Sequence, residues 1–292
     1  MIPTLNSVTA GSGLALPEYV SLAARHGFSG VEFSIDNAAQ LVAQTSFADV
    51  AAIFESHKVL PIVMNLPVDW RGDENTFETG LANLPLLARL AQDLDCTRCV
   101  TPVFPDAGIR AAEYASQSTR RLVEIARVLA DNGLRLGLEF LGPKHFRTNP
   151  DNVWFYDIAG ALQAVESISR TARLENLGLL VDSWHWYTSG GTAMDLASIP
   201  IEQIVAVHIN DAPDLPRDAQ IDNARLLPGQ SGIIDIQAFL QTLAAIGYDG
   251  PLGVETFSAE LNSLAPDQAA ARAAASVTQV LNNAGIEPVR LL

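Results

Sequence analysis

The feature that most constrains the fold is an eightfold alternation of short apolar strands with amphipathic helices. The strands are nearly continuous hydrophobic runs, which is typical of a parallel sheet buried on both faces. The predicted strands are "IPTLNS" (2–7), "GVEFS" (30–34), "VLPIVMNL" (59–66), "RCVTPVF" (98–104), "RLGLEFL" (135–141), "LGLLVDS" (177–183), "IVAVHIN" (204–210) and "PLGVETF" (251–257). Helices are predicted over 17–27, 47–58, 79–95, 118–133, 152–169, 235–250 and 267–283, with a weak sixth helix at 191–203 that Pro200 interrupts.

Eight such units in 292 residues predict a closed (β/α)8 TIM barrel. No low-complexity linker divides the chain, so residues 1–292 are expected to form one domain. A doubly wound open sheet is the alternative, but no phosphate-binding GxGxxG or GxxxxGK[ST] motif follows the first strand.

Composition limits the classes of partner. The formal net charge is -15, which argues against a nucleic-acid surface. No segment approaches the roughly 20 apolar residues of a membrane span, and the start lacks the features of a signal peptide. The two cysteines, Cys96 and Cys99, lead into an apolar strand, so we interpret them as structural. We therefore expect a reduced, cytoplasmic protein.

Four polar residues stand at equivalent points of the last four strands. Glu139, Asp182, His208 and Glu255 each follow three or four apolar residues. The carboxyl ends of barrel strands open on one face, about 4.8 Å apart, so these side chains can converge. Three crowded carboxylates would repel one another unless a cation compensated. The set predicts a divalent metal site, with Mn²⁺ expected first and Mg²⁺, Co²⁺ or Zn²⁺ as alternatives.

Other polar residues fall near these strand ends. His185, three residues after Asp182, and Arg225 are candidates for contacting substrate oxygens, and Lys144 and His145 follow Glu139 closely. For each of them a purely structural role, such as a surface salt bridge for Arg225, is the alternative.

Asp211 and the tryptophans complete the candidate set. Asp211 either fixes the tautomer of a neighbouring imidazole or caps its turn. All four tryptophans lie on the strand-to-helix side, and aromatic walls suit the apolar faces of a sugar ring, so Trp70 and Trp186 are taken as substrate-binding candidates.

In these motifs the chain resembles the xylose isomerase-like superfamily of sugar phosphate isomerases and epimerases. The most specific parts are "GLEF", "VDSWH", "VHIND", "RLLPG" and "GVETF", in that order. The resemblance to ketose 3-epimerases implies that Glu139, Asp182, His208 and Glu255 bind one metal ion. It also implies that His185 and Arg225 contact substrate.

The chain departs from the epimerases at His145, where they carry a second glutamate six residues after the first ligand. Inosose dehydratases and lyases acting on 3-keto-glycosides share the metal site, so β-elimination stays open. The apurinic endonucleases of the superfamily use extra histidines that this chain lacks, and the acidic charge also argues against that activity.

The implied activity is a metal-dependent isomerisation or epimerisation of a sugar, sugar phosphate or keto-sugar through an enediolate. Glu139 and Glu255 would serve as base and acid on opposite faces. The alternatives are a lyase or dehydratase acting on an inosose or 3-keto-glycoside, and a non-catalytic barrel subunit. The expected partner is a small-molecule substrate, and a homo-oligomer stays open.

Overall fold

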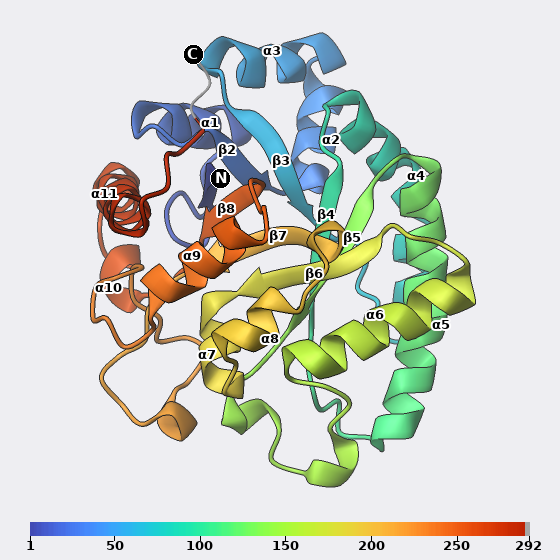
Figure 1. Cartoon of the computed structure of the whole chain (residues 1–292). Coiled ribbons are helices and arrows are strands. Elements are labelled where there is room, and N and C mark those ends of the chain that lie inside the picture. The colour runs from blue at the N-terminus through green and yellow to red at the C-terminus, as the bar shows by residue number, and fades with distance from the viewer. Residues whose placement is uncertain (290–292) are drawn as a thin grey trace.

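The computed structural model describes residues 1–289 and shows a closed barrel of eight parallel strands (Figure 1). Each strand pairs with its neighbour in the chain, and the last pairs with the first to close the barrel. The fold predicted from the sequence is therefore confirmed. The strands are β1 (Ile2–Asn6), β2 (Gly30–Phe33), β3 (Leu60–Asn65), β4 (Arg98–Val103), β5 (Arg135–Phe140), β6 (Leu177–Asp182), β7 (Ile204–Ile209) and β8 (Pro251–Val254).

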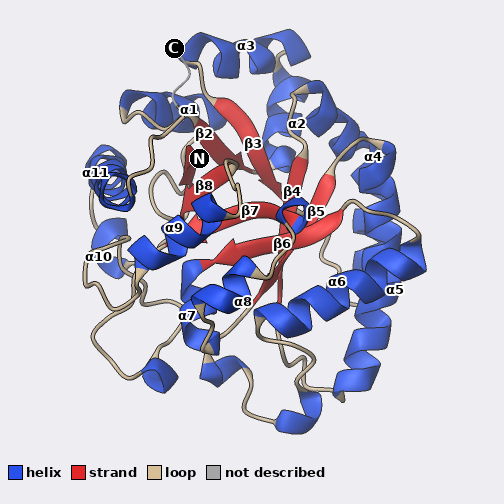
Figure 2. Ribbon diagram, in the orientation of Figure 1, coloured by secondary structure: helices blue, strands red, loops and turns tan. Residues whose placement is uncertain are grey.

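Helices surround the strands, which occupy the middle of the molecule (Figure 2). Buried apolar side chains fill both the barrel interior and the layer between strands and helices. The α-helices are α1 (Leu16–Arg25), α2 (Ile35–Gln44), α3 (Phe47–His57), α4 (Glu74–Asp93), α5 (Ala111–Asp131), α6 (Ile158–Ala172), α7 (Ser183–Ser189), α8 (Ala193–Ala197), α9 (Ile236–Ala245), α10 (Ala259–Asn262) and α11 (Pro266–Ala284).

Helix boundaries differ from the expectation where a capping residue decides them. Helix α6 begins at Ile158 rather than at 152, because the Asp157 carboxylate accepts a hydrogen bond from the Gly160 amide at 2.8 Å. Helix α4 begins earlier than expected, at Glu74, where Asp73 caps it. Helices α2, α7 and α10 were not expected, and the weak sixth helix is reduced to α8 and a 3-10 turn at Ile201–Gln203.

Two further features bear on the sequence expectations. Cys96 and Cys99 are both buried free thiols, and burial raises the pKa of Cys96 to about 12. A raised pKa disfavours the reactive thiolate, which agrees with a structural role for the two residues. Among the described residues, no helix is both long and apolar enough to cross a membrane.

Candidate active site

Four side chains converge at the carboxyl ends of the last four strands. Glu139 lies in β5, Asp182 ends β6, His208 lies in β7, and Glu255 follows β8 directly. The register places Asp182 beside His208 on adjacent strands. One potential ligand atom from each residue lies within 4.8 Å of the others. The fold thus brings together the four residues that the sequence singled out as metal ligands.

The imidazole of His208 is held from behind and faces the cluster in front. Its Nε2 lies 2.7 Å from Oε1 of Glu32. Its Nδ1 has no hydrogen-bond partner and faces three carboxylate oxygens, of Glu255 at 3.4 Å, Asp182 at 3.8 Å and Glu139 at 4.0 Å. Burial opposes protonation, but the Glu32 and Glu255 carboxylates outweigh it and raise the pKa of His208 well above its usual value.

The carboxylates differ in their electrostatic surroundings. Burial, followed by the charges of Glu255 and Asp182, raises the pKa of Glu139 well above its usual range. Burial also raises the pKa of Asp182, although Arg225 opposes the shift. For Glu255 burial is outweighed by His208 and Arg225, which lower its pKa to about 2. Oε1 of Glu139 is buried without a hydrogen-bond partner.

Arg225 is buried and binds the cluster with its whole guanidinium group. Nη1 lies 2.9 Å from Oδ2 of Asp182 and 2.8 Å from Oε2 of Glu255. Nη2 donates to Oδ1 of Asp222 at 2.8 Å, and Nε donates to the Asp222 carbonyl at 3.2 Å. Arg225 therefore holds Asp182 and Glu255 in place rather than projecting freely into solvent.

His185 lies on α7, fully buried behind Arg225. Its Nε2 is 3.2 Å from Nη2 of Arg225 and 3.6 Å from Oε1 of Glu139, and its Nδ1 is 3.3 Å from the amide nitrogen of Gly142. Because a neutral imidazole accepts at one nitrogen only, just one of the Arg225 and Gly142 contacts can be an accepted hydrogen bond. Burial and then Arg225 lower the pKa of His185 well below its usual value, so the ring is neutral.

The sequence reasoning missed a second layer of polar residues from the first strands. Glu32 in β2 and Asn6 in β1 are buried, and Nδ2 of Asn6 donates to Glu32 at 3.0 Å and to Glu255 at 3.2 Å. Asn210, after β7, donates to both carboxylate oxygens of Asp182, at 3.0 and 3.2 Å. The sequence does carry a signal for both residues, because each is a polar residue in an otherwise apolar strand. Glu32 stands within "GVEF", and Asn6 ends "PTLN".

A glycine leaves room for the contact between His208 and Glu32. Gly253 of β8 lies beside His208 in the sheet register. A β-carbon at this position would stand 2.9 Å from Cδ2 of His208 and would overlap Oε1 of Glu32. Glycine at 253 therefore lets the carboxylate reach the imidazole, which is a packing requirement that no local propensity reveals.

Four candidates for substrate binding lie outside the cavity wall. Lys144 and His145 are exposed in a 3-10 turn, where Lys144 pairs with Asp218 at 2.6 Å and the rings of His145 and Phe146 lie 4.1 Å apart. Trp70 and Trp186 are buried, and each indole N–H donates to a group inside the protein. The acceptors are the Thr101 hydroxyl at 2.9 Å and the Thr192 carbonyl at 3.0 Å, respectively. The aromatic side chains that line the cavity are those of Phe104 and Phe257.

Asp211 does not contact an imidazole in the described structure. Its buried carboxylate accepts hydrogen bonds from the backbone amides of Ala212, Ser231, Gly232 and Ile234 at 2.7–3.0 Å. Of the two roles expected for Asp211, these contacts show the turn cap, which organises the long segment between β7 and α9 that carries Arg225. Glu32 takes the other role, as the partner of an imidazole.

The four converging residues stand at a cavity of about 300 Å³. Its wall combines neutral polar side chains, apolar side chains and charged groups, and it includes Glu139, His208 and Glu255 of the four. The lining residues are Asn6, Val8, Asn65, Val100, Thr101, Pro102, Phe104, Glu139, Leu141, Leu180, His208, Asp222, Arg225, Glu255 and Phe257. Its size is at the lower end of the range for pockets that bind small molecules, which is roughly 300–1,000 Å³.

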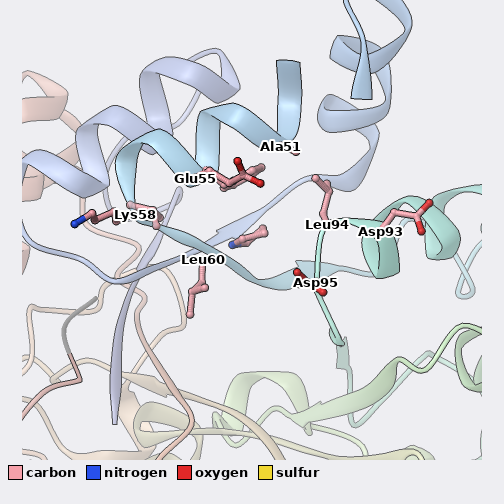
Figure 3. A pocket seen from close by; sticks show the side chains of 10 residues that line it. Ala51, Glu55, Lys58, Leu60, Asp93, Leu94 and Asp95 are labelled. Atoms are coloured by element: carbon pink, nitrogen blue, oxygen red, sulfur yellow. The ribbon is translucent and has the colours of Figure 1, made fainter. Parts of the chain in front are cut away.

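A second cavity, of about 190 Å³, lies at the opposite end of the barrel, between α3, the start of β3 and the end of α4 (Figure 3). Its charged side chains, Glu55, Lys58, Asp93 and Asp95, are all exposed. The buried charged side chains lie at the first cavity, so we place the candidate active site there.

Comparison with known proteins identifies the family of this barrel. The xylose isomerase-like TIM barrel family model matches residues 20–280. An inosose isomerase from Bacillus velezensis is 26% identical over 266 residues, covering 90% of this chain and 91% of that protein. A 3-dehydroshikimate dehydratase from Pseudomonas aeruginosa is 34% identical over 139 residues, but these cover 47% of this chain and only 20% of that protein.

Among solved structures, the IOLI protein with a bound zinc atom superimposes with a TM-score of 0.80. It is 24% identical, and the alignment covers 97% of this chain and 99% of that one, so it supports the fold. The expected resemblance is confirmed, since the family model spans most of the barrel. The chain belongs to the xylose isomerase-like TIM barrel family.

Proposed function

We propose that the protein is a divalent-metal-dependent isomerase or epimerase of a sugar or keto-sugar. The observation that carries the proposal is the convergence of Glu139, Asp182, His208 and Glu255 on one point beside a cavity. The reaction class is supported by the relative named inosose isomerase, because the alignment covers 91% of that protein.

The residues fit a metal ion on their own chemistry. Because an ionised carboxylate only accepts, Glu32 accepts a hydrogen bond from the Nε2–H of His208 and leaves Nδ1 directed at three carboxylate oxygens. Nδ1 of His208 and Oε1 of Glu139 are both buried without a hydrogen-bond partner, which is the arrangement that a shared cation would satisfy.

Three oxygen donors and one nitrogen donor suit Mn²⁺, which we propose first, and Mg²⁺, Co²⁺ and Zn²⁺ remain compatible with the set. When bound, the ion would stabilise the negative charge that develops on substrate oxygens after a proton leaves the adjacent carbon. A non-catalytic subunit is a weaker explanation, since a binding module needs no such ligand set.

The protein groups would move the proton. Glu139 and Glu255 come from strands on different sides of the cluster and both line the cavity, so one can abstract a proton and the other can deliver one. Arg225 holds Glu255 and Asp182 by its guanidinium, which would keep both carboxylates aimed at the reaction centre.

A lyase is the second candidate, because of the dehydratase relative. A lyase must protonate a departing oxygen from a residue near the cavity. Lys144 and His145 are exposed and lie outside the cavity wall, while His185 is buried behind Arg225. The placement of these three side chains favours isomerisation.

The test is solvent isotope exchange. The protein is stripped of metal, reloaded separately with each of the four ions, and incubated in deuterated water with an inosose or a ketose. We expect label in the recovered substrate and its isomer or epimer, dependent on the ion, by mass spectrometry. An unsaturated or released product with no labelled isomer would replace the isomerase assignment with a lyase, and no metal-dependent exchange at all would contradict both.

A further inference from the structure

We infer that the cavity selects an uncharged polyhydroxylated carbonyl compound and rejects substrates that carry a phosphate or carboxylate group. The inference rests on the proposed function, since it names the class of substrate for the same centre. It follows from the absence of a free cationic donor among the described residues that line the cavity.

Arg225 is the only arginine or lysine among the described lining residues, and its guanidinium faces groups of the protein itself. Four of its five N–H groups point at Asp182, Glu255 and Asp222, with donor–acceptor distances of 2.8–3.2 Å. The fifth faces Nε2 of the buried His185 at 3.2 Å. An anionic substrate group would have to displace these partners, each of which is itself buried or partly buried.

His208, the other basic lining residue, offers no free donor either. Its Nε2 is hydrogen-bonded to Glu32, and its Nδ1 faces the carboxylates of Glu255, Asp182 and Glu139. Both basic side chains of the wall are thus turned toward the protein's own carboxylates.

The charge balance of the centre is negative even with a metal ion bound. Glu139, Asp182, Asp222 and Glu255 carry four negative charges when ionised. Arg225 and a divalent ion supply three positive charges, and the Glu32 carboxylate adds a further negative charge behind His208. Charges of like sign in a buried site are costly, so a phosphate or carboxylate would enter against the field.

Two exposed basic residues, Arg71 and Lys144, each have a partner in the protein. Arg71 donates to the Pro102 carbonyl at 3.2 Å and lies 5.1 Å from the centre of the Phe104 ring, and Lys144 is paired with Asp218. Neither lines the cavity. The substrate pocket therefore has no built anion site within its described wall.

The rest of the wall suits hydroxyl groups and ring faces. The Thr101 hydroxyl accepts from Trp70 and keeps its own proton to donate, and Asn65 is an exposed amide at the mouth. Phe104 and Phe257 offer apolar faces to the C–H side of a carbon ring. These are neutral contacts that fit a polyol or keto-sugar.

The experiment compares matched neutral and anionic compounds on the Mg²⁺-loaded protein by calorimetry. The pairs are D-fructose with D-fructose 6-phosphate, and an inosose with 3-dehydroshikimate. We expect at least one neutral member to bind, with a Kd at least tenfold below that of its anionic counterpart. Equal or tighter binding of the anionic members, or no binding of either neutral member, would overturn the inference.

A variant pair tests the cause. Asp222→Asn removes one negative charge and the ion pair with Arg225, so the preference for neutral over anionic compounds should fall severalfold. Asp131→Asn, which changes an exposed carboxylate at the end of α5 and outside the wall, should leave the preference unchanged. An unaltered preference in Asp222→Asn would contradict the role given to Arg225.

The outcomes separate this inference from the proposed function. Preferential binding of a neutral compound without solvent exchange would refute the isomerase proposal and leave the selectivity standing. Metal-dependent exchange into fructose 6-phosphate or dehydroshikimate at the rate of the neutral partner would refute the selectivity and leave the proposed metal-dependent chemistry standing.

Discussion

His208 and Glu32 make a close, fully buried contact of 2.7 Å between strands on different sides of the barrel. Replacing Glu32 by Gln keeps the side-chain volume but removes the charge that orients the ring and makes it a better ligand. Loss of such an outer partner commonly weakens metal binding by about 10–100-fold. We predict that Glu32→Gln raises the metal Kd by that factor, as measured by competition with a chelator.

The control for this change is Glu18→Gln, an exposed residue of α1, which should leave the Kd unaltered. A wild-type Kd in Glu32→Gln would show that the imidazole needs no carboxylate behind it. Circular dichroism of both variants distinguishes a changed site from a changed fold.

A second residue-scale prediction separates a ligand from a proton-transfer group. His208→Ala should lose metal, because a nitrogen donor is removed. Glu255→Gln should keep more of the metal through its amide oxygen, yet lose activity by about 10²–10⁴-fold, because an amide cannot accept the proton. Metal content by elemental analysis and isotope exchange are measured together.

Glu166→Gln, an exposed change on α6, serves as the control for both measurements. Wild-type turnover in both His208→Ala and Glu255→Gln would mean that the centre lies elsewhere.

At the scale of elements, the segment between β7 and α9 depends on one carboxylate. Asp211 binds four backbone amides of this segment, and an antiparallel bridge with Leu226 adds two more hydrogen bonds, each of 2.8 Å. Arg225 precedes Leu226, so the same contacts place the guanidinium. Asp211→Asn exchanges two acceptor oxygens for one and sets an amide donor against backbone N–H groups.

We predict that Asp211→Asn lowers the free energy of unfolding by about 2–3 kcal/mol, the usual cost of breaking hydrogen bonds to a buried charged group. Urea denaturation measures it. The comparison is Asp235→Asn, which changes an exposed cap of α9 and should cost about 1 kcal/mol or less. If the two variants lost equal stability, the segment would not depend on Asp211 in the way its contacts indicate.

At the scale of the whole molecule, the metal centre should contribute to stability. The proposed ligands come from four consecutive strands, so an ion bound there would tie half of the barrel together and would be absent from the unfolded chain. Binding to the folded state alone adds about 2.7 kcal/mol at a ligand concentration 100 times the Kd. We predict that Tm rises with metal concentration and falls on adding a chelator.

In His208→Ala the same titration should produce a much smaller shift of Tm. A wild-type protein whose Tm ignores both chelator and metal would argue that the four residues do not form a metal site.

Periodicity and strand-end residues were sufficient to predict the architecture and the candidate ligands. All eight strands were located, because apolar runs buried on both faces leave a local signal. Since parallel barrel strands end at one face, Glu139, Asp182, His208 and Glu255 could be grouped from their positions alone.

What the sequence could not give is the partner of each polar side chain. Glu32 meets His208 across 176 positions, and Asn6 meets Glu255 across 249, so no local pattern records either contact. The same limit left two roles open for Asp211, the imidazole partner and the turn cap, of which its contacts show the second. It also left the hydrogen-bond partners of Trp70 and Lys144 unpredicted. Local periodicity gives the positions of the strands and helices, because each element buries its own apolar residues. The direction of a polar side chain depends instead on which distant donor or acceptor the closed barrel brings within hydrogen-bonding reach.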